Sequence, residues 1–280
     1  MSIRIITDST SEISQVQAKV FNIDVMPMTI IFGDETFIDG INLSNKEFYE
    51  HMRASDKLPK TSLINSEMFR EKFKKFSDED DIIGIFISSE LSGSLQSAFI
   101  AKESMPNKKI HLIDSREVTF GLTALVLYAI RLRDEGKSAQ EIVDAIEEAK
   151  KRLVLVAVVD DLKYLRLGGR LSSASAFFGT IMRVKPLIQI TDGKVLAVHK
   201  TLGLHRAFAW LLEQYQNADV DTSMPRLFGH SNAVETLDRF QKYVSRHSDF
   251  PLEGVFPIGP TVGVHAGPGA VGFCFFTKAK

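Results

Sequence analysis

The sequence has very little cysteine: Cys274 is the single copy among 280 residues. An intramolecular disulfide is therefore excluded, and Cys274, which stands in an apolar run, is expected to be a small buried side chain in a reducing compartment. Long apolar runs are missing as well, since no stretch approaches the ~20 apolar residues of a membrane helix. The N-terminus lacks the pattern of a signal peptide. We therefore expect a soluble, cytoplasmic protein without stable membrane insertion.

An excess of one charge is also absent, because 34 Lys and Arg residues face 35 Asp and Glu residues. A nucleic-acid-binding protein usually shows a basic stripe, so no nucleic-acid partner is expected. Phe is plentiful instead, with 20 copies against one Trp and five Tyr. Phe brings large apolar surface without a polar group. That composition is consistent with a well-filled core and also with a dry pocket for an apolar ligand.

The first half of the sequence alternates strands and helices. Short apolar runs, each followed by Asp or Ser residues that suit helix caps, predict buried strands at 3–7, 82–87 and 110–113. Two further segments, at 44–54 and 138–150, begin with capping boxes and are predicted to be helices. Residues 25–39 carry β signals for a hairpin or edge strands. This alternation predicts βαβ units and a mainly parallel sheet.

Near residue 155 the pattern changes to strands joined by hairpins. Strands are predicted at 153–159 and, on either side of the turn sequence Thr191-Asp192-Gly193-Lys194, at 187–190 and 195–199. Further helices are predicted at 205–216 and 232–246, and further strands at 226–229, 254–258, 261–264 and 270–276. We expect an α/β protein with an N-terminal domain at 1–157 and a C-terminal domain at 158–280 that has a mainly antiparallel or mixed sheet. A cleft between the two domains is the expected ligand site.

Familiar catalytic and cofactor motifs are missing. The segment Gly267–Gly272 fits G-x-G-x-x-G, but only eight residues follow and 271–276 has the pattern of a strand, so a dinucleotide site is excluded. The sequence has no Walker A motif, no Gly-x-Ser-x-Gly, no His-Glu-x-x-His and no paired cysteines. No cofactor and no metal are therefore expected.

Polar side chains gather in a few loops. The loop around Ser92 combines hydroxyls, a glycine and the free N–H groups of a helix start, which suits an anion. On local grounds, helix capping is the commoner explanation for Ser92, and a helix-entry turn is the commoner one for Thr61 and Ser62. His265 lies between a predicted strand and a glycine turn, and Arg170 follows two glycines. Taken alone, His265 is most simply an ordinary surface or core residue, and Arg170 an exposed charge.

Together these segments resemble the DegV family of fatty-acid-binding proteins, the lipid-carrying subunits of the bacterial fatty acid kinase system. The matching pieces are each short, but six of them occur in the right order along the whole chain. They are Thr7–Thr10, Lys60–Ser62, Leu91–Ser94, Gly168–Ser172, Val184–Pro186 and His265–Gly272.

The resemblance implies two α/β domains with a long-chain fatty acid held between them. It implies that the carboxylate is bound by Thr61, Ser62, Ser92, Gly93 and His265, and a protonated His265 would add a charge-assisted bond. It implies no catalytic residue of the protein's own. A separate ATP-dependent fatty acid kinase makes the acyl phosphate, which agrees with the missing nucleotide motifs.

Other residues are placed more loosely by the resemblance. Arg170 is expected near the head group or on the surface that faces the kinase. Family members often carry an Arg after the Val-His strand for docking the kinase, and this sequence has Leu202 there, with Lys200 or Arg206 as substitutes. The candidates for lining the acyl tunnel lie on one uncharged, helix-like stretch: Phe177, Phe178, Ile181 and Met182.

Burial of ~15 methylenes at roughly 0.8 kcal/mol each gives a gross gain of about 12 kcal/mol, so affinity is expected to come from the tail and orientation from the head group. Two other functions stay open. In the first, Ser92 or Thr61 is the nucleophile of an acyl hydrolase or transferase and His265 is its base. In the second, the same loops sense a small anionic metabolite.

Overall fold

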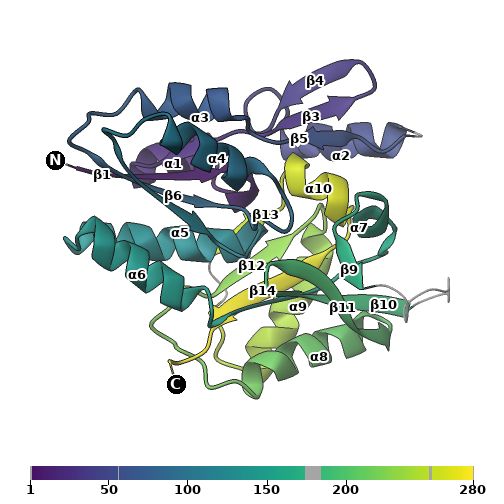
Figure 1. Ribbon diagram of the computed structural model, residues 1–280. Coiled ribbons are helices and arrows are strands. Elements are labelled where there is room, and N and C mark those ends of the chain that lie inside the picture. The colour runs from purple at the N-terminus through teal and green to yellow at the C-terminus, as the bar shows by residue number, and fades with distance from the viewer. Residues whose placement is uncertain (1, 56, 174–183, 252–253, 280) are drawn as a thin grey trace.

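The structure is a computed structural model that describes residues 2–55, 57–173, 184–251 and 254–279. Two larger sheets and one small sheet form its framework (Figure 1). The N-terminal sheet has the strand order β2-β1-β6-β7, and all its neighbouring strands are parallel. Its strands are β1 (Ile3–Asp8), β2 (Asp24–Met26), β6 (Asp81–Phe86) and β7 (Lys109–Asp114). The predicted parallel sheet is confirmed.

Helices cover both faces of the N-terminal sheet. They are α1 (Gln15–Phe21), α3 (Ser66–Phe73), α4 (Ser94–Glu103), α5 (Thr119–Asp134) and α6 (Ala139–Ala149). Helix α5 contacts β1 and β6 on one side and β8, β12 and β14 on the other, so it lies between the two larger sheets. A helix in that position is buried all round, and α5 accordingly carries apolar or small residues on nearly every face of its first three turns.

The C-terminal sheet has the order β13-β12-β14-β8-β10-β11-β9 and is mixed, as predicted. Its strands are β8 (Leu153–Val158), β9 (Leu171–Ser173), β10 (Val184–Thr191), β11 (Lys194–Leu202), β12 (Leu227–His230), β13 (Val255–Pro257) and β14 (Val271–Phe276). Helices α8 (Leu204–Gln216) and α9 (Val234–His247) cover the face turned away from α5, where Phe208, Phe228, Phe240 and Phe273 form an aromatic core. Much of the abundant Phe therefore serves packing.

The small sheet has the order β4-β3-β5 and lies beside α2 (Asn45–Ala54) (Figure 1). It consists of β3 (Thr29–Phe32), β4 (Glu35–Ile38) and β5 (Lys60–Ser62). The hairpin predicted within 25–39 is confirmed by the antiparallel pairing of β3 with β4.

Two expectations about the chain need comment. The strand predicted at 261–264 is wrong, because these residues belong to helix α10 (Pro260–Ala266). Two other short helical elements are the 3₁₀ helix η1 (Ser9–Ser11) and the α-helix α7 (Lys163–Leu167). Pro260 at the first position of a helix has the φ that a helix requires, and this preference outweighs the β-branched residues after it. The expected domain boundary after residue 157 falls inside β8, whose partners are β10 and β14; the division into domains stays a prediction.

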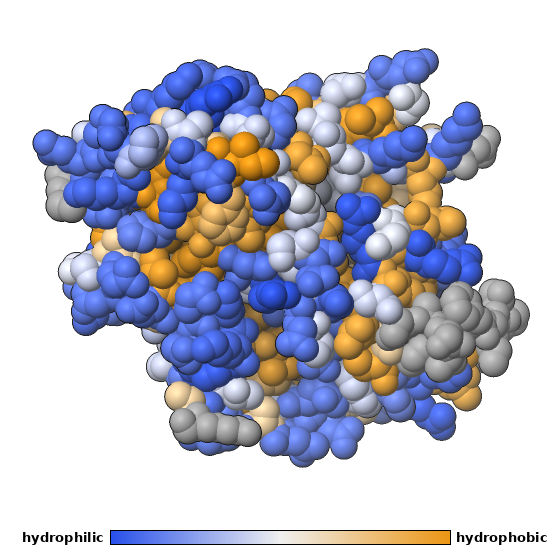
Figure 2. All heavy atoms as spheres, in the orientation of Figure 1, coloured by the Kyte–Doolittle hydropathy of each residue, from blue (hydrophilic) through white to orange (hydrophobic). Residues whose placement is uncertain are grey.

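The outer surface is mostly hydrophilic, with hydrophobic side chains showing between the polar ones on the face in view (Figure 2). Within the described residues, no helix combines the length and the apolar composition needed to cross a bilayer. Cys274 is buried in β14, as expected.

Candidate functional site

A cavity of about 190 Å³ lies where the carboxyl ends of the N-terminal strands meet one face of the C-terminal sheet. Ligand sites of α/β proteins commonly form at the carboxyl ends of strands. Most of the lining is apolar, and the C-terminal sheet contributes Leu155, Ala157, Val159, Ile188, Ile190 and Val195. Polar side chains are concentrated at the end formed by β5, α10 and the loop before α4.

Thr61 and His265 meet at this polar end although 204 residues separate them. The Thr61 Oγ1 and His265 Nε2 atoms are hydrogen-bonded at 3.1 Å, and the ring tautomer decides which atom donates. Thr61 is positioned by β5, where it pairs with Ile30 of β3. The helix-entry turn considered for Thr61 and Ser62 is therefore wrong, because both residues belong to a strand. Ser62 is exposed and also lines the cavity.

Ser92 and Gly93 line the cavity just before α4. Gly93 is the N-cap residue and has no side chain with which to cap, so the Ser94 N–H donates to Ser92 Oγ instead, at 3.3 Å. Ser94 Oγ lies 3.0 Å from Ser92 Oγ and accepts the Ile64 N–H at 3.2 Å, which ties the β5 loop to the α4 loop. The local capping explanation and the proposed binding role are thus compatible for Ser92.

Arg170 reaches the cavity because of how α7 ends. Gly169 has φ +68°, and the Arg170 N–H donates to the Leu165 carbonyl at 2.9 Å, which is a Schellman motif. The turn points the Arg170 side chain toward the α4 loop, where its Nε donates to the Leu91 carbonyl at 3.1 Å. Its Nη1 donates to the Gly168 carbonyl at 2.7 Å. The guanidinium is therefore held rigidly beside the polar end of the cavity.

The His265 ring is fitted against Gly168. A Cβ added to Gly168 would lie 2.2 Å from His265 Nδ1, so only glycine leaves room for the ring. Nδ1 is buried and has no hydrogen-bond partner among the described residues. Burial, and secondly the charge of Arg170, lower the pKa of His265 to about 4. Burial thus favours the uncharged imidazole at neutral pH, and the protonated form considered from the sequence for the bound carboxylate stays a prediction.

The whole chain matches one known family model. The model of the uncharacterised DegV family covers residues 2–278. The chain belongs to the DegV family.

Relatives of this DegV protein are found among bacterial sequences and solved structures. A DegV domain-containing protein of Caldanaerobacter subterraneus subsp. tengcongensis is 34% identical over 279 residues, which is 99% of either chain. A fatty-acid-binding DegV family protein from Thermus thermophilus has a TM-score of 0.90 at 25% identity and covers 99% of this chain and 100% of its own. DegV from Bacillus subtilis, a fatty acid binding protein, has a TM-score of 0.86 at 28% identity, with coverages of 99% and 100%. The family resemblance predicted from the sequence is confirmed.

Helix α10, which carries His265 in this DegV protein, is anchored by buried carboxyl groups of the N-terminal residues. Glu12 Oε2 accepts the Gly259 N–H at 2.7 Å, and Asp39 Oδ2 accepts the Thr261 N–H at 3.3 Å and its hydroxyl at 2.5 Å. Burial raises the pKa of Asp39, and burial together with the nearby Asp39 charge raises the pKa of Glu12 well above its usual range. The sequence reasoning missed both residues. Pro260 after Gly259 was the signal for a helix start here.

The structure does not bring all predicted residues of the DegV protein to the cavity. Lys200 on β11, Leu202 at its end and Arg206 in the first turn of α8 are exposed and are not among the lining residues. The predicted tunnel residues, Phe177, Phe178, Ile181 and Met182, lie outside the described residues. The lining that is described comes from strands β8, β10 and β11 and from the start of α5 instead.

The polar end of this DegV cavity is suited to a single anionic group next to an apolar chain. It offers the hydroxyls of Thr61 and Ser92, one imidazole nitrogen and the charge of Arg170, whereas the remaining lining is largely aliphatic. A carboxylate that leaves water needs such donors. Among the residues described, no group of three or more His, Cys, Asp or Glu side chains could hold a metal ion.

Proposed function

We propose that this DegV protein binds a long-chain fatty acid, with the tail in the apolar cavity and the carboxylate between Thr61, Ser92 and His265. The main observation behind this proposal is the cavity. At its polar end the Thr61 Oγ1 and His265 Nε2 atoms lie 3.1 Å apart, and Arg170 lines the same cavity. Ser62 and Gly93 line the same end. The relatives from Thermus thermophilus and Bacillus subtilis, both described as fatty acid binding, support the ligand class.

Arg170 supplies the positive charge in this proposal. His265 is uncharged at neutral pH, so its contribution is a neutral hydrogen bond unless the carboxylate itself raises the ring's pKa on binding. The guanidinium already uses Nε and Nη1 for carbonyl groups, which orients its remaining N–H groups without further loss of side-chain freedom on binding. Preorganised donors of this kind favour one orientation of the ligand.

The protein is further proposed to present the carboxylate to a separate ATP-dependent kinase, which forms the acyl phosphate. This part follows from the family resemblance and from the absence of nucleotide-binding motifs in the sequence. The mouth of the site supports it, because Ser62 and Gly93 are exposed. Lys200 and Arg206 remain proposed contacts of the kinase at the β11–α8 junction, with Leu202 between them, and a cytoplasmic location is part of the same proposal.

One observation favours the alternative of an acyl hydrolase or transferase. The Thr61 hydroxyl and His265 are within hydrogen-bond distance, as a nucleophile and its base would be. Against this reading, Nδ1 of the ring faces Gly168, and no carboxylate in the described part of the chain orients it. A third group that orients the base is the usual feature of such sites. Turnover of nitrophenyl esters that is lost in Thr61→Val would support the alternative.

The test is to purify the protein, extract its ligands, and identify any bound lipid by native mass spectrometry. The expected result is a mass increase equal to one fatty acid, which returns when delipidated protein is mixed with palmitic acid. Cetyl alcohol, which has the same tail and no carboxylate, is the matched ligand and should bind more weakly. Equal binding of the two would contradict a carboxylate site at Thr61, Ser92 and His265. Failure of delipidated protein to bind any fatty acid would refute the proposal.

A further inference from the structure

The cavity has a direction, which the register of the C-terminal sheet defines. Leu155 and Ala157 of β8 alternate along the strand with Val159, which directly follows it, and all three line the cavity. Ala157 is paired with Ile188 of β10. The β8 chain continues from Val159 toward α7 and Arg170, so Val159 marks the polar end. Leu155 lies four residues away, or about 13 Å along a strand. Its neighbour at that depth on β10 is Ile190.

A second cavity, of about 540 Å³, begins where the first one ends. Its lining is polar and charged and includes Arg116, Glu117, Lys150, Arg152 and Asp192. Ile190 is the one residue that lines both cavities within the described part of the chain. Ile190 therefore lies at the boundary between an apolar space and a polar one.

Glu117, which lies just before α5, lines the second cavity close to this boundary. The residue is 3% exposed, and its Oε2 atom has no hydrogen-bond partner among the described residues. A Cβ added to Gly121 would lie 2.4 Å from Glu117 Oε2 and 2.9 Å from Leu155 Cδ1, so the carboxyl group and the Leu155 side chain both lie beside Gly121. Burial raises the pKa of Glu117 well above its usual range. Leu155 and Ile190 thus line the end of the apolar cavity that is remote from Arg170, and the buried carboxyl group of Glu117 lies close to this end.

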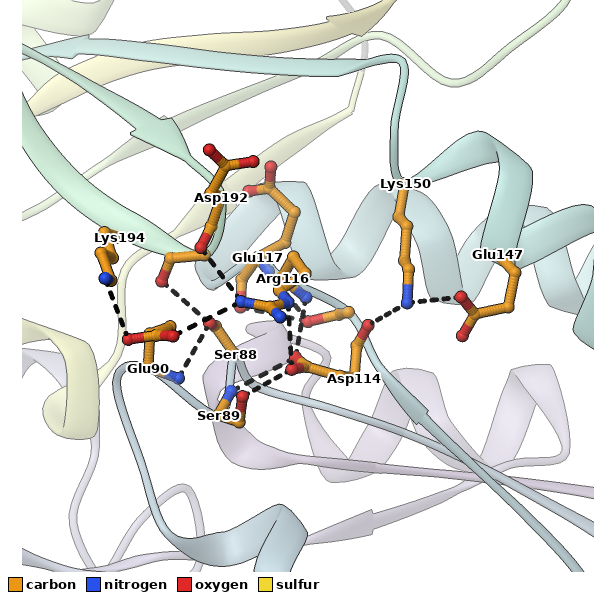
Figure 3. A network of polar contacts seen from close by, with 12 residues as sticks. Ser88, Ser89, Glu90, Asp114, Arg116, Glu117, Glu147, Lys150, Asp192 and Lys194 are labelled. Atoms are coloured by element: carbon orange, nitrogen blue, oxygen red, sulfur yellow. Dashed lines mark hydrogen bonds and ion pairs between the residues drawn. The ribbon is translucent and has the colours of Figure 1, made fainter.

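The β10–β11 hairpin, which carries Ile190, is held in place by residues of the loops that follow β6 and β7 (Figure 3). Ser88 Oγ donates to the Gly193 carbonyl at 2.8 Å, and Arg116 Nη1 donates to the Asp192 carbonyl at 3.2 Å. Lys194 Nζ lies 3.5 Å from a carboxylate oxygen of Glu90. Gly193 has φ +79° and leaves no room for a Cβ against Ser88 Oγ. The backbone two residues beyond Ile190 is therefore fixed, and the side chain cannot move away with its strand.

We propose that Ile190 sets the depth of the acyl cavity and with it the longest fatty acid that the protein binds well. This inference rests on the proposed function. A tail that extends past Leu155 has to displace Ile190 or enter the charged cavity behind it, where its methylenes gain little from burial.

The experiment measures the chain-length profile of the bound acid. Delipidated wild-type protein, Ile190→Ala, Ile190→Phe and Ile188→Ala are each mixed with equal amounts of lauric, myristic, palmitic, stearic, arachidic and behenic acids. Native mass spectrometry then gives the share of each acid in the bound fraction. Ile188→Ala is the matched control, because Ile188 lines the same cavity on the same strand face but not the second cavity. The share among bound molecules is insensitive to a partly unfolded fraction.

We expect Ile190→Ala to shift the profile toward longer acids, by up to about fourfold for each methylene that the new space accommodates. Ile190→Phe should shift it toward shorter acids, and Ile188→Ala should keep the wild-type maximum. An unchanged maximum in Ile190→Ala, or an equal shift in Ile188→Ala, would overturn the inference and leave the proposed function intact. A wild-type protein that binds none of the six acids would overturn both.

Discussion

The contact between Gly168 and His265 offers the sharpest test of the head-group geometry. Gly168 has φ −75°, so alanine suits its backbone, and the only obstacle to a methyl group is its surroundings. The methyl carbon would lie 2.2 Å from His265 Nδ1, whereas non-bonded carbon contacts are usually at about 3.5 Å. The ring therefore has to shift by about 1.3 Å, which breaks its hydrogen bond with Thr61.

The magnitude follows from two opposing effects. Overpacking of this kind destabilises the folded protein by about 1–3 kcal/mol. Replacing Gly by Ala at a compatible backbone conformation stabilises it by about 0.4–1 kcal/mol, because the unfolded chain loses conformational entropy. Gly168→Ala should therefore lower the free energy of unfolding by about 1–2 kcal/mol. Loss of one hydrogen bond to a charged carboxylate should weaken palmitate binding by roughly 10- to 100-fold.

A double-mutant cycle identifies the ring as the cause. Urea denaturation gives the free energy of unfolding for wild type, Gly168→Ala, His265→Ala and the double variant. In the His265→Ala background the obstacle is gone, so Gly168→Ala should be neutral or slightly stabilising, with a coupling free energy of about 1–3 kcal/mol. Gly169→Asn is the matched control, because Gly169 has open space and a positive φ that Asn tolerates. Additive effects of the two substitutions would refute the reasoning.

Three further predictions address the same site. Thr61→Val and His265→Ala should each reduce kinase-coupled phosphorylation of bound palmitate by roughly tenfold or more while shifting the thermal midpoint little, and equal losses of both would contradict a head-group role. Arg170→Ala should raise the pKa of His265 from about 4, still below its ordinary value because burial remains, as NMR titration of the ring will show. Glu12 has a raised pKa in the folded protein, so its contribution to stability is full below its ordinary value of 4.5 and is lost as pH rises through the folded pKa. Glu12→Gln should therefore flatten the fall in stability toward higher pH, and an unchanged pH profile in urea denaturation would count against a buried acid.

The fold was largely predictable because its elements carry strong local signals. The capping boxes at Ser44 and Ser138 mark real helix starts, and Thr191–Lys194 is the turn of the β10–β11 hairpin. The prediction of a strand at 261–264 was wrong because the β-branched residues Thr261 and Val262 favour a strand locally. The anchoring of their helix by Glu12 and Asp39 depends on contacts more than 200 residues away in sequence, which no local pattern contains.

The candidate site was predictable in its polar part only. Thr61, Ser92 and His265 were singled out by residue type and by the family resemblance, and the structure brings all three to one end of the cavity. The described apolar lining was not predicted. An alternating strand such as β8 shows which residues are buried, but packing density rather than sequence period decides whether a buried face meets another side chain or a cavity. Ile188 and Ile190 therefore looked like ordinary core residues.

Helix α10 has a consequence for how a ligand leaves. Its first turn is bonded to Glu12 and Asp39 of the N-terminal residues, while its last residue leads through a short turn into β14, an inner strand of the C-terminal sheet. Helix α10 packs both against β5, which carries Thr61, and against α7, which precedes Arg170. A rotation of the two larger sheets against each other would therefore strain these contacts. Under the proposed function, a carboxylate held by Thr61, His265 and Arg170 would resist such a rotation, and its release would make the rotation easier.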